Sequence, residues 1–145
     1  MIRDTGEKPI SLTQKSAPAA ADLDTLLFFE GHRAALPLFE ALDNALTERF
    51  PEAKKRVQKT QITYYHRHVF ACVSFARVKR KAEMPESWLT LTLGLSYPLD
   101  SERVAVRTEV YPGRWTIHIV LGREEEVNGE VFSWLEQAYD FSERK

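Results

Sequence analysis

The stretch Trp88–Ser96, WLTLTLGLS, decides the fold because leucine alternates with small polar residues along it. A period of two is typical of a β-strand with one buried face and one open face. Other elements must therefore cover the leucine face. The open face carries hydroxyl groups and one glycine, which come from Thr90, Thr92, Gly94 and Ser96.

Two further stretches show the same alternation and predict neighbouring strands. The first is Val69–Phe75, where Val69, Ala71, Val73 and Phe75 share one face and the other face holds Phe70, Cys72 and Ser74. The second is Val104–Val110, where the valines and Thr108 oppose Ala105, Arg107 and Glu109.

The sequence EVYPGRWTIHIV, which starts at Glu109, predicts a hairpin with Pro112 and Gly113 at the centre of its turn. A two-residue loop sets a definite register between its strands. In that register Tyr111 lies opposite Arg114, Glu109 opposite Thr116, and Arg107 opposite His118. A longer loop would shift this pairing.

Helical periodicity flanks the predicted sheet on both sides. We expect helices over Leu23–Glu30, over Ala34–Phe50 with Pro37 in its first turn, and from Asn128 to the region of Phe141. The last helix has an apolar stripe of Val131, Trp134, Leu135 and Ala138. Together these elements predict an α+β fold: a mainly antiparallel, twisted sheet of about five strands, with N-terminal and C-terminal helices packed on one face.

The 145-residue chain is long enough for one hydrophobic core. Residues 1–21 mix proline, serine and charges without hydrophobic periodicity, so we expect a flexible N-terminal arm. Residues 22–145 are then a single α+β domain.

Composition excludes several classes of protein. No apolar run approaches the roughly 20 residues that span a bilayer, and the first residues lack the apolar segment of a secretory signal. We therefore expect a cytoplasmic protein without membrane contact. The single Cys72 excludes an intrachain disulfide and a multi-cysteine zinc site. His66 and His68 supply two ligands at most, so we expect no metal and no cofactor.

The net charge of -1 conceals an uneven distribution of charge. The segment 54–82 contains nine Lys or Arg residues and no acid, whereas the rest of the chain carries every Asp and Glu. Such a block creates a positive local potential that attracts anions. We therefore expect a small anionic or phosphorylated ligand, bound between the polar sheet face and this segment.

The candidate ligand-binding residues divide by chemistry. Lys59, Arg103 and Arg114 supply charge, and Gln61 and Tyr65, which share a strand parity with Lys59, supply hydrogen bonds. His118 supplies a polar contact or a proton switch, with Arg107 beside it in the predicted register. No catalytic residue can be assigned from a known motif.

Other functions stay open at this point. The basic segment 54–81, with Tyr64 and Tyr65, is also compatible with nucleic-acid binding. A small enzyme could use His118 as its general base. A protein-interaction module, including a homodimer, is a further alternative.

Several motifs occur in an order that resembles a bacterial family of small domains of unknown function. They include KTQI at Lys59–Ile62, DSER at Asp100–Arg103 and GRWTIH at Gly113–His118, and the resemblance covers Leu27–Ser142. The chain has Ile117 where related sequences often have a second histidine. The resemblance implies a single cytoplasmic domain and brings no established activity.

Overall fold

The computed structural model describes residues 19–145, with side chains from Leu23 onward. The described residues divide into two units, with the boundary between Glu30 and Gly31. Most of the predicted arm lies outside the described residues, but its end, from Ala19, begins helix α2, Ala19–Phe28. The side chains of Leu23, Leu26 and Leu27 are exposed on this helix.

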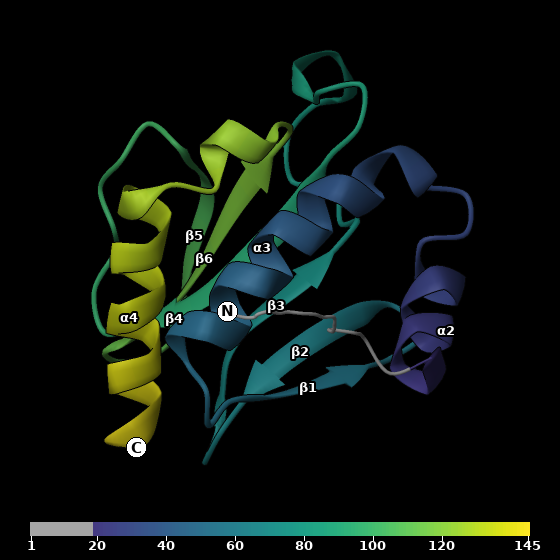
Figure 1. Cartoon of the computed structure of the whole chain (residues 1–145). Coiled ribbons are helices and arrows are strands. Elements are labelled where there is room, and N and C mark those ends of the chain that lie inside the picture. The colour runs from purple at the N-terminus through teal and green to yellow at the C-terminus, as the bar shows by residue number, and fades with distance from the viewer. Residues whose placement is uncertain (1–18) are drawn as a thin grey trace. The chain divides into compact units, whose positions relative to one another are not determined.

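The second unit contains one sheet and two long helices (Figure 1). The helices are α3, Leu36–Arg49, and α4, Gly129–Glu143. Three short 3-10 helices also occur: η1, Arg33–Ala35; η2, Lys81–Glu83; and η3, Glu124–Glu126. The strands are β1, Lys54–Val57; β2, Gln61–Tyr65; β3, Val69–Ser74; β4, Leu89–Leu95; β5, Val104–Tyr111; and β6, Arg114–Leu121.

The sheet has six strands in the order β1-β2-β3-β4-β6-β5, and every neighbouring pair is antiparallel. The α+β class and the antiparallel sheet are confirmed, but the expected number of about five strands is corrected to six. The additional strand arises because the basic stretch folds back at residues 58–60. Lys54–Val57 and Gln61–Tyr65 thus form a hairpin.

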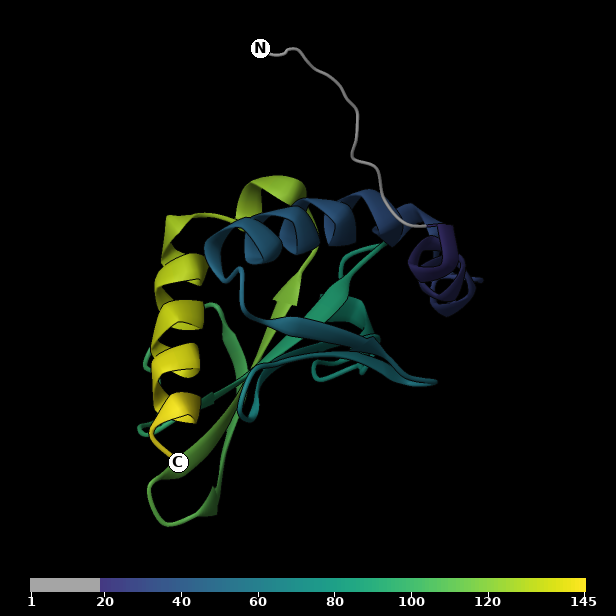
Figure 2. The same cartoon turned by 60° about the horizontal axis from the view of Figure 1, so that its bottom comes forward.

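Helices α3 and α4 lie on the same side of the sheet, as predicted (Figures 1 and 2). Between them and the sheet lies the core, which includes Leu38, Phe39, Leu42, Leu46, Ile62, Val73, Leu89, Leu91, Leu93, Leu95, Ile117, Ile119, Leu121, Val131, Leu135 and Ala138. Local signals fix the helix starts. Pro37 stands in the first turn of α3, and the Asn128 side chain accepts a hydrogen bond from the Val131 amide at the start of α4.

A bulge reverses the predicted faces at the start of β3. Tyr64 pairs with Ala71, but the next residue, Tyr65, pairs with Val69, so Phe70 is an extra residue. Phe70 turns into the core against Phe50 and Tyr139, with ring centroids 5.4 and 5.1 Å away. The predicted placement of Phe70 beside Cys72 is therefore wrong, because an exposed phenylalanine would lose this burial.

A second bulge shifts the β5–β6 hairpin. Tyr111 lies opposite Arg114 as predicted, and Gly113 has the positive φ of 76° that the two-residue turn requires. An extra residue at Val110 then places Glu109 opposite Trp115, and Arg107 opposite Ile117. The predicted pairing of Arg107 with His118 is wrong, because the bulge moves Arg107 to the helix-covered face.

Candidate functional site

A row of polar side chains crosses the sheet face that α3 and α4 leave open. Arg56 of β1 pairs with Thr63 of β2, Thr63 with Cys72 of β3, Cys72 with Thr92 of β4, and Thr92 with His118 of β6. Directly paired residues share a face, so the five side chains form one continuous line. We call this line the polar row.

Hydrogen bonds join the His118 end of the polar row. Thr92 Oγ1 lies 2.9 Å from Nδ1 of His118. Burial lowers the pKa of the His118 imidazole, so the ring is neutral near pH 7. Burial also raises the pKa of the Cys72 thiol, and a hydrogen bond with Thr92 offsets this only in part. This end of the row is therefore uncharged.

A shallow hollow of about 170 Å³ lies beside the polar row, between β3 and β4. Cys72, Thr92 and Thr116 give it a polar wall, and Val69 gives it an apolar one. Gly94 forms part of its lining, and a Cβ atom added there would meet no heavy atom within 4 Å. The absence of a side chain at this position keeps the hollow open.

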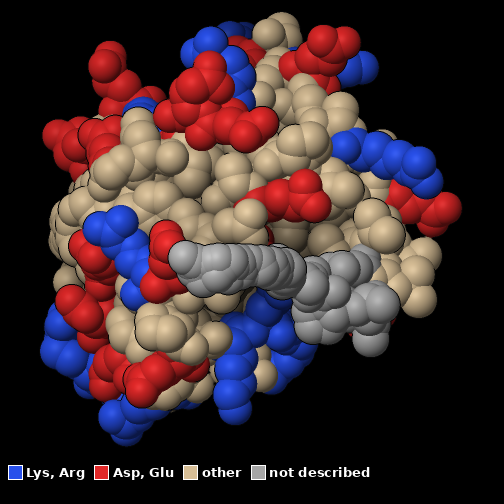
Figure 3. Space-filling model, in the orientation of Figure 1, with Lys and Arg blue, Asp and Glu red and all other residues tan. Residues whose placement is uncertain are grey.

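The β1 end of the polar row is basic. The Arg56 guanidinium lies 4.6 Å from the centre of the Tyr65 ring, a cation–π geometry. Within residues 19–145, no carboxylate pairs with Arg56 or Lys54. The hydroxyl of Thr63, the cross-strand neighbour of Arg56, donates a hydrogen bond to Gln58 Oε1 at 2.8 Å. Figure 3 views the molecule from the helix-covered side, where Lys and Arg side chains gather below α3 in the region of β1, and acidic and basic side chains alternate around α4.

Four of the predicted ligand-binding residues lie on or near this arrangement. Gln61 and Tyr65 stand at the two ends of β2 with the parity of Thr63, and Lys59 is exposed in the turn before them. His118 ends the polar row. Arg114 is exposed at the hairpin, farther along β6.

Arg103 and Arg107 have structural partners instead. Arg103 donates to Glu126 O at 2.7 Å and to Asn128 Oδ1 and Glu130 Oε1, each at 3.1 Å, so it ties the loop before β5 to the start of α4. Arg107 Nε donates to Leu99 O at 2.9 Å on the helix-covered face. The structure therefore does not bring these two arginines to the polar row.

Arg56 is the residue of this arrangement that sequence reasoning missed. Its side chain reaches the polar row only because β1 and β2 form a hairpin. The turn between them, Gln58–Thr60, contains no glycine, proline, asparagine or aspartate, so the sequence does not predict a turn there. The segment KKRV does not alternate between polar and apolar residues, and four residues are too short to establish a strand.

The histidines of the β2–β3 turn anchor helix α4. His66 Nδ1 lies 3.0 Å from Glu143 Oε1, and His68 Nδ1 lies 3.1 Å from Ser142 O. Desolvation alone would raise the pKa of Glu143, but hydrogen bonds from His66 and the Arg67 amide lower it overall. No group of three metal-ligating side chains occurs in the described part of the chain.

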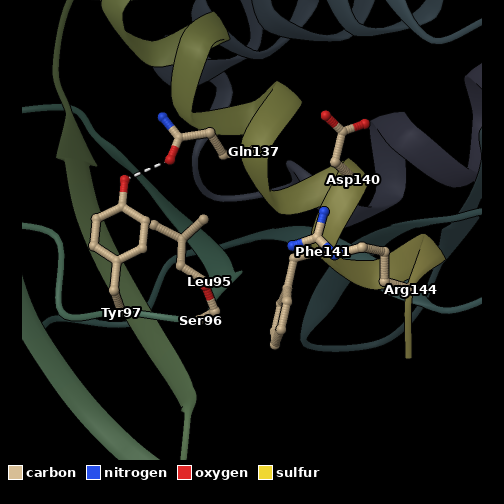
Figure 4. A pocket seen from close by; sticks show the side chains of 7 residues that line it. All are labelled: Leu95, Ser96, Tyr97, Gln137, Asp140, Phe141 and Arg144. Carbon is tan, nitrogen blue, oxygen red and sulfur yellow. Dashed lines mark hydrogen bonds between the residues drawn. The ribbon is translucent and has the colours of Figure 1, made fainter.

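A second hollow, of about 150 Å³, lies between the end of β4 and the last turns of α4 (Figure 4). Tyr97 donates a hydrogen bond to Gln137 there, and Asp140 and Arg144 bring opposite charges to its lining. Burial, followed by repulsion from Arg114, lowers the pKa of the neighbouring Lys145. The lining of the second hollow thus carries charges of both signs.

No helix within residues 19–145 has the length and apolar character needed to cross a bilayer. The six-stranded sheet, covered by helices on one face and carrying polar groups on the other, defines a small α+β domain. The chain belongs to the family described as Domain of unknown function (DUF5655), whose model matches residues 27–142. Comparison with curated proteins gives no match. Comparison with solved structures gives none either.

Proposed function

We propose that this protein is a binding module for a small anionic or phosphorylated ligand, held on the open face of its sheet. The polar row carries the proposal, since it joins a neutral imidazole at His118 to the Arg56 guanidinium, which has no carboxylate partner in the described part of the chain. The hollow beside Gly94 lies along the same line and can receive a small part of the ligand.

The His118 end suits an acceptor oxygen. The Thr92 hydroxyl lies 2.9 Å from Nδ1 of His118 and can donate its hydrogen to that nitrogen. In that arrangement Nε2 carries the ring hydrogen and donates outward. An uncharged N–H donor of this kind fits a carbonyl, hydroxyl or phosphate oxygen.

The spacing of the strands sets the size of the ligand. Neighbouring strands lie about 4.8 Å apart, so the hollow between β3 and β4 is roughly 12 Å from β1. A single phosphate ion cannot reach both. The ligand that fits has its anionic group against Arg56 and Lys54 and a body that extends to the hollow.

Two observations favour this ligand over nucleic acid. The basic segment is divided between the two faces of the sheet, because Lys55 turns to the helix side and pairs with Asp43 at 3.0 Å. Arg80, farther along the segment, pairs with Glu83 at 2.9 Å. A continuous track for phosphates would keep these cations unpaired on one face.

The proposed location is the cytoplasm, where reducing conditions keep Cys72 a free thiol.

A thermal-shift screen of phosphorylated metabolites, inorganic phosphate and oligonucleotides tests the proposal. A metabolite that binds only the folded state raises the melting temperature. His118→Gln, Arg56→Gln and Gly94→Val should each abolish the shift, while Lys81→Gln, which removes the same charge outside the polar row, should preserve it. Inorganic phosphate alone should give little shift.

Three outcomes would contradict this reading. The first is the absence of a shift with any phosphorylated metabolite. The second is an oligonucleotide shift that Arg56→Gln and Lys81→Gln weaken equally and that salt removes, which would favour nucleic-acid binding. The third is chemical turnover of a bound compound that stops in His118→Gln, which would identify an enzyme.

A further inference from the structure

Strand β5 forms one edge of the sheet, with β6 as its neighbour. Its first three residues are half-buried, but its last five, Arg107–Tyr111, are exposed. Figure 2 shows the β5–β6 hairpin extending past the end of α4, so this helix does not cover the exposed segment. An edge strand presents unpaired N–H and C=O groups, and such groups can pair with another strand.

The sequence of the exposed segment is complementary to itself. Val106–Val110 reads VRTEV, with opposite charges one residue on either side of Thr108. If a second copy runs antiparallel with Thr108 opposite Thr108, then Arg107 of each copy lies opposite Glu109 of the other. Two-fold symmetry makes this charge pair occur twice. Opposite charges directly across antiparallel strands stabilise the pairing.

The faces of the side chains agree with this register. Arg107 and Glu109 pair with Ile117 and Trp115 of β6, so both point to the helix-covered face. Thr108 pairs with Thr116 and points to the open face. In a sheet that continues across the two-fold axis, each residue would thus meet a partner on its own face.

Neighbouring registers are disfavoured by charge. Moving the two-fold centre by one residue places Arg107 opposite Arg107, or Glu109 opposite Glu109. Like charges directly opposite one another destabilise a strand pair. The register centred on Thr108 is therefore selected over both of its neighbours.

Both charged side chains are held in place and still have atoms free to pair. Arg107 uses Nε on Leu99 O, which leaves the two terminal guanidinium nitrogens. Glu109 Oε2 accepts from the Gly113 amide at 3.0 Å, which leaves Oε1. Within the described residues neither side chain forms a salt bridge. Ordered but unpaired charges reduce the entropy lost on association.

We infer that β5 pairs with β5 of a second copy, antiparallel and centred on Thr108, to form a two-fold homodimer with one continuous sheet. The contact is short, so the dimer is weak and its population depends on protein concentration. The inference is independent of the proposed ligand.

Sedimentation of the full chain over a range of concentrations tests the dimer. The wild type should pass from monomer to dimer as concentration rises. Arg107→Glu places a glutamate opposite Glu109 in both symmetry-related pairs. The resulting repulsion between like charges should raise the dimer dissociation constant roughly tenfold or more. The double change Arg107→Glu with Glu109→Arg should restore it. Arg77→Glu, with the same charge change on an exposed residue outside β5, should leave it unaltered.

Cross-linking tests the register separately. In a Cys72→Ser background, Thr108→Cys places two thiols directly opposite each other, so mild oxidation should give a covalent dimer. Val110→Cys lies on the same exposed edge but opposite Val106, so it should cross-link poorly. The inference is overturned by a monomer at all concentrations, by a double charge swap that stays monomeric, or by equal cross-linking at both positions.

Discussion

The β3 bulge predicts a large difference between two adjacent residues. Phe70 is 1% exposed and contacts two aromatic rings, whereas Val69 is 46% exposed. Replacing a fully buried phenylalanine with alanine typically costs about 3–5 kcal/mol of unfolding free energy. Val69→Ala removes little buried surface and should cost about 1 kcal/mol or less.

Urea unfolding of the full chain, followed by circular dichroism, measures both costs. With a denaturant slope of about 2 kcal/mol per molar urea, Phe70→Ala should lower the midpoint by roughly 2 M. Val69→Ala should lower the urea midpoint by about 0.5 M or less. Phe70→Leu keeps most of the apolar volume and should fall between the two, which guards against complete loss of folding in the alanine variant. A costly Val69→Ala together with a neutral Phe70→Ala would refute the bulge and restore simple alternation.

Three further predictions concern electrostatics. Arg103→Ala should destabilise the fold by about 2 kcal/mol, because it leaves the Glu126 carbonyl and the Asn128 side chain without their charged donor; a melting temperature equal to that of wild type would contradict this. Because burial lowers the pKa of His118, the unfolded state binds its proton first on acidification; stability should therefore fall as pH drops below about 6.5, and His118→Gln should flatten that part of the pH profile. The raised pKa of Cys72 predicts slow alkylation at pH 8 compared with an unfolded control, and equal rates would argue against burial of this thiol.

Much of the fold follows from local chemistry. The alternation in Leu89–Leu95 identifies the central strand, Asn128 marks the start of α4, and Gly113 supplies the positive φ of the last hairpin turn. Each of these signals depends on residues close together in the sequence, so each can be recognised without knowledge of the rest of the structure.

The bulges could not be predicted in this way. A bulge adds one residue and inverts every side chain beyond it, and its position depends on packing between distant segments. Phe70 is the extra residue because Phe50 and Tyr139 provide a place for its ring. The displacement of Arg107 from the polar row has the same origin at Val110.

The roles of the arginines also depend on distant contacts. The sequence alone does not distinguish the roles of Arg103 and Arg56, since an arginine can bind either a ligand or a backbone carbonyl. The partners of Arg103 are residues 126, 128 and 130, which follow it in the chain only after strands β5 and β6. Arg56 pairs with Thr63 across the strands and lies over the Tyr65 ring, so neither of these neighbours neutralises its charge.

Helix α4 is fastened at both ends by residues far away in the chain, Arg103 at its start and His66 at its end. The contact between His66 and Glu143 spans 77 residues, so it can form only after most of the domain has been synthesised. Contacts between segments so far apart in the sequence slow folding. Until residues 129–143 leave the ribosome, α4 cannot cover its part of the leucine face of β4. The nascent chain at that stage exposes apolar surface, which promotes aggregation and is the kind of surface that chaperones protect.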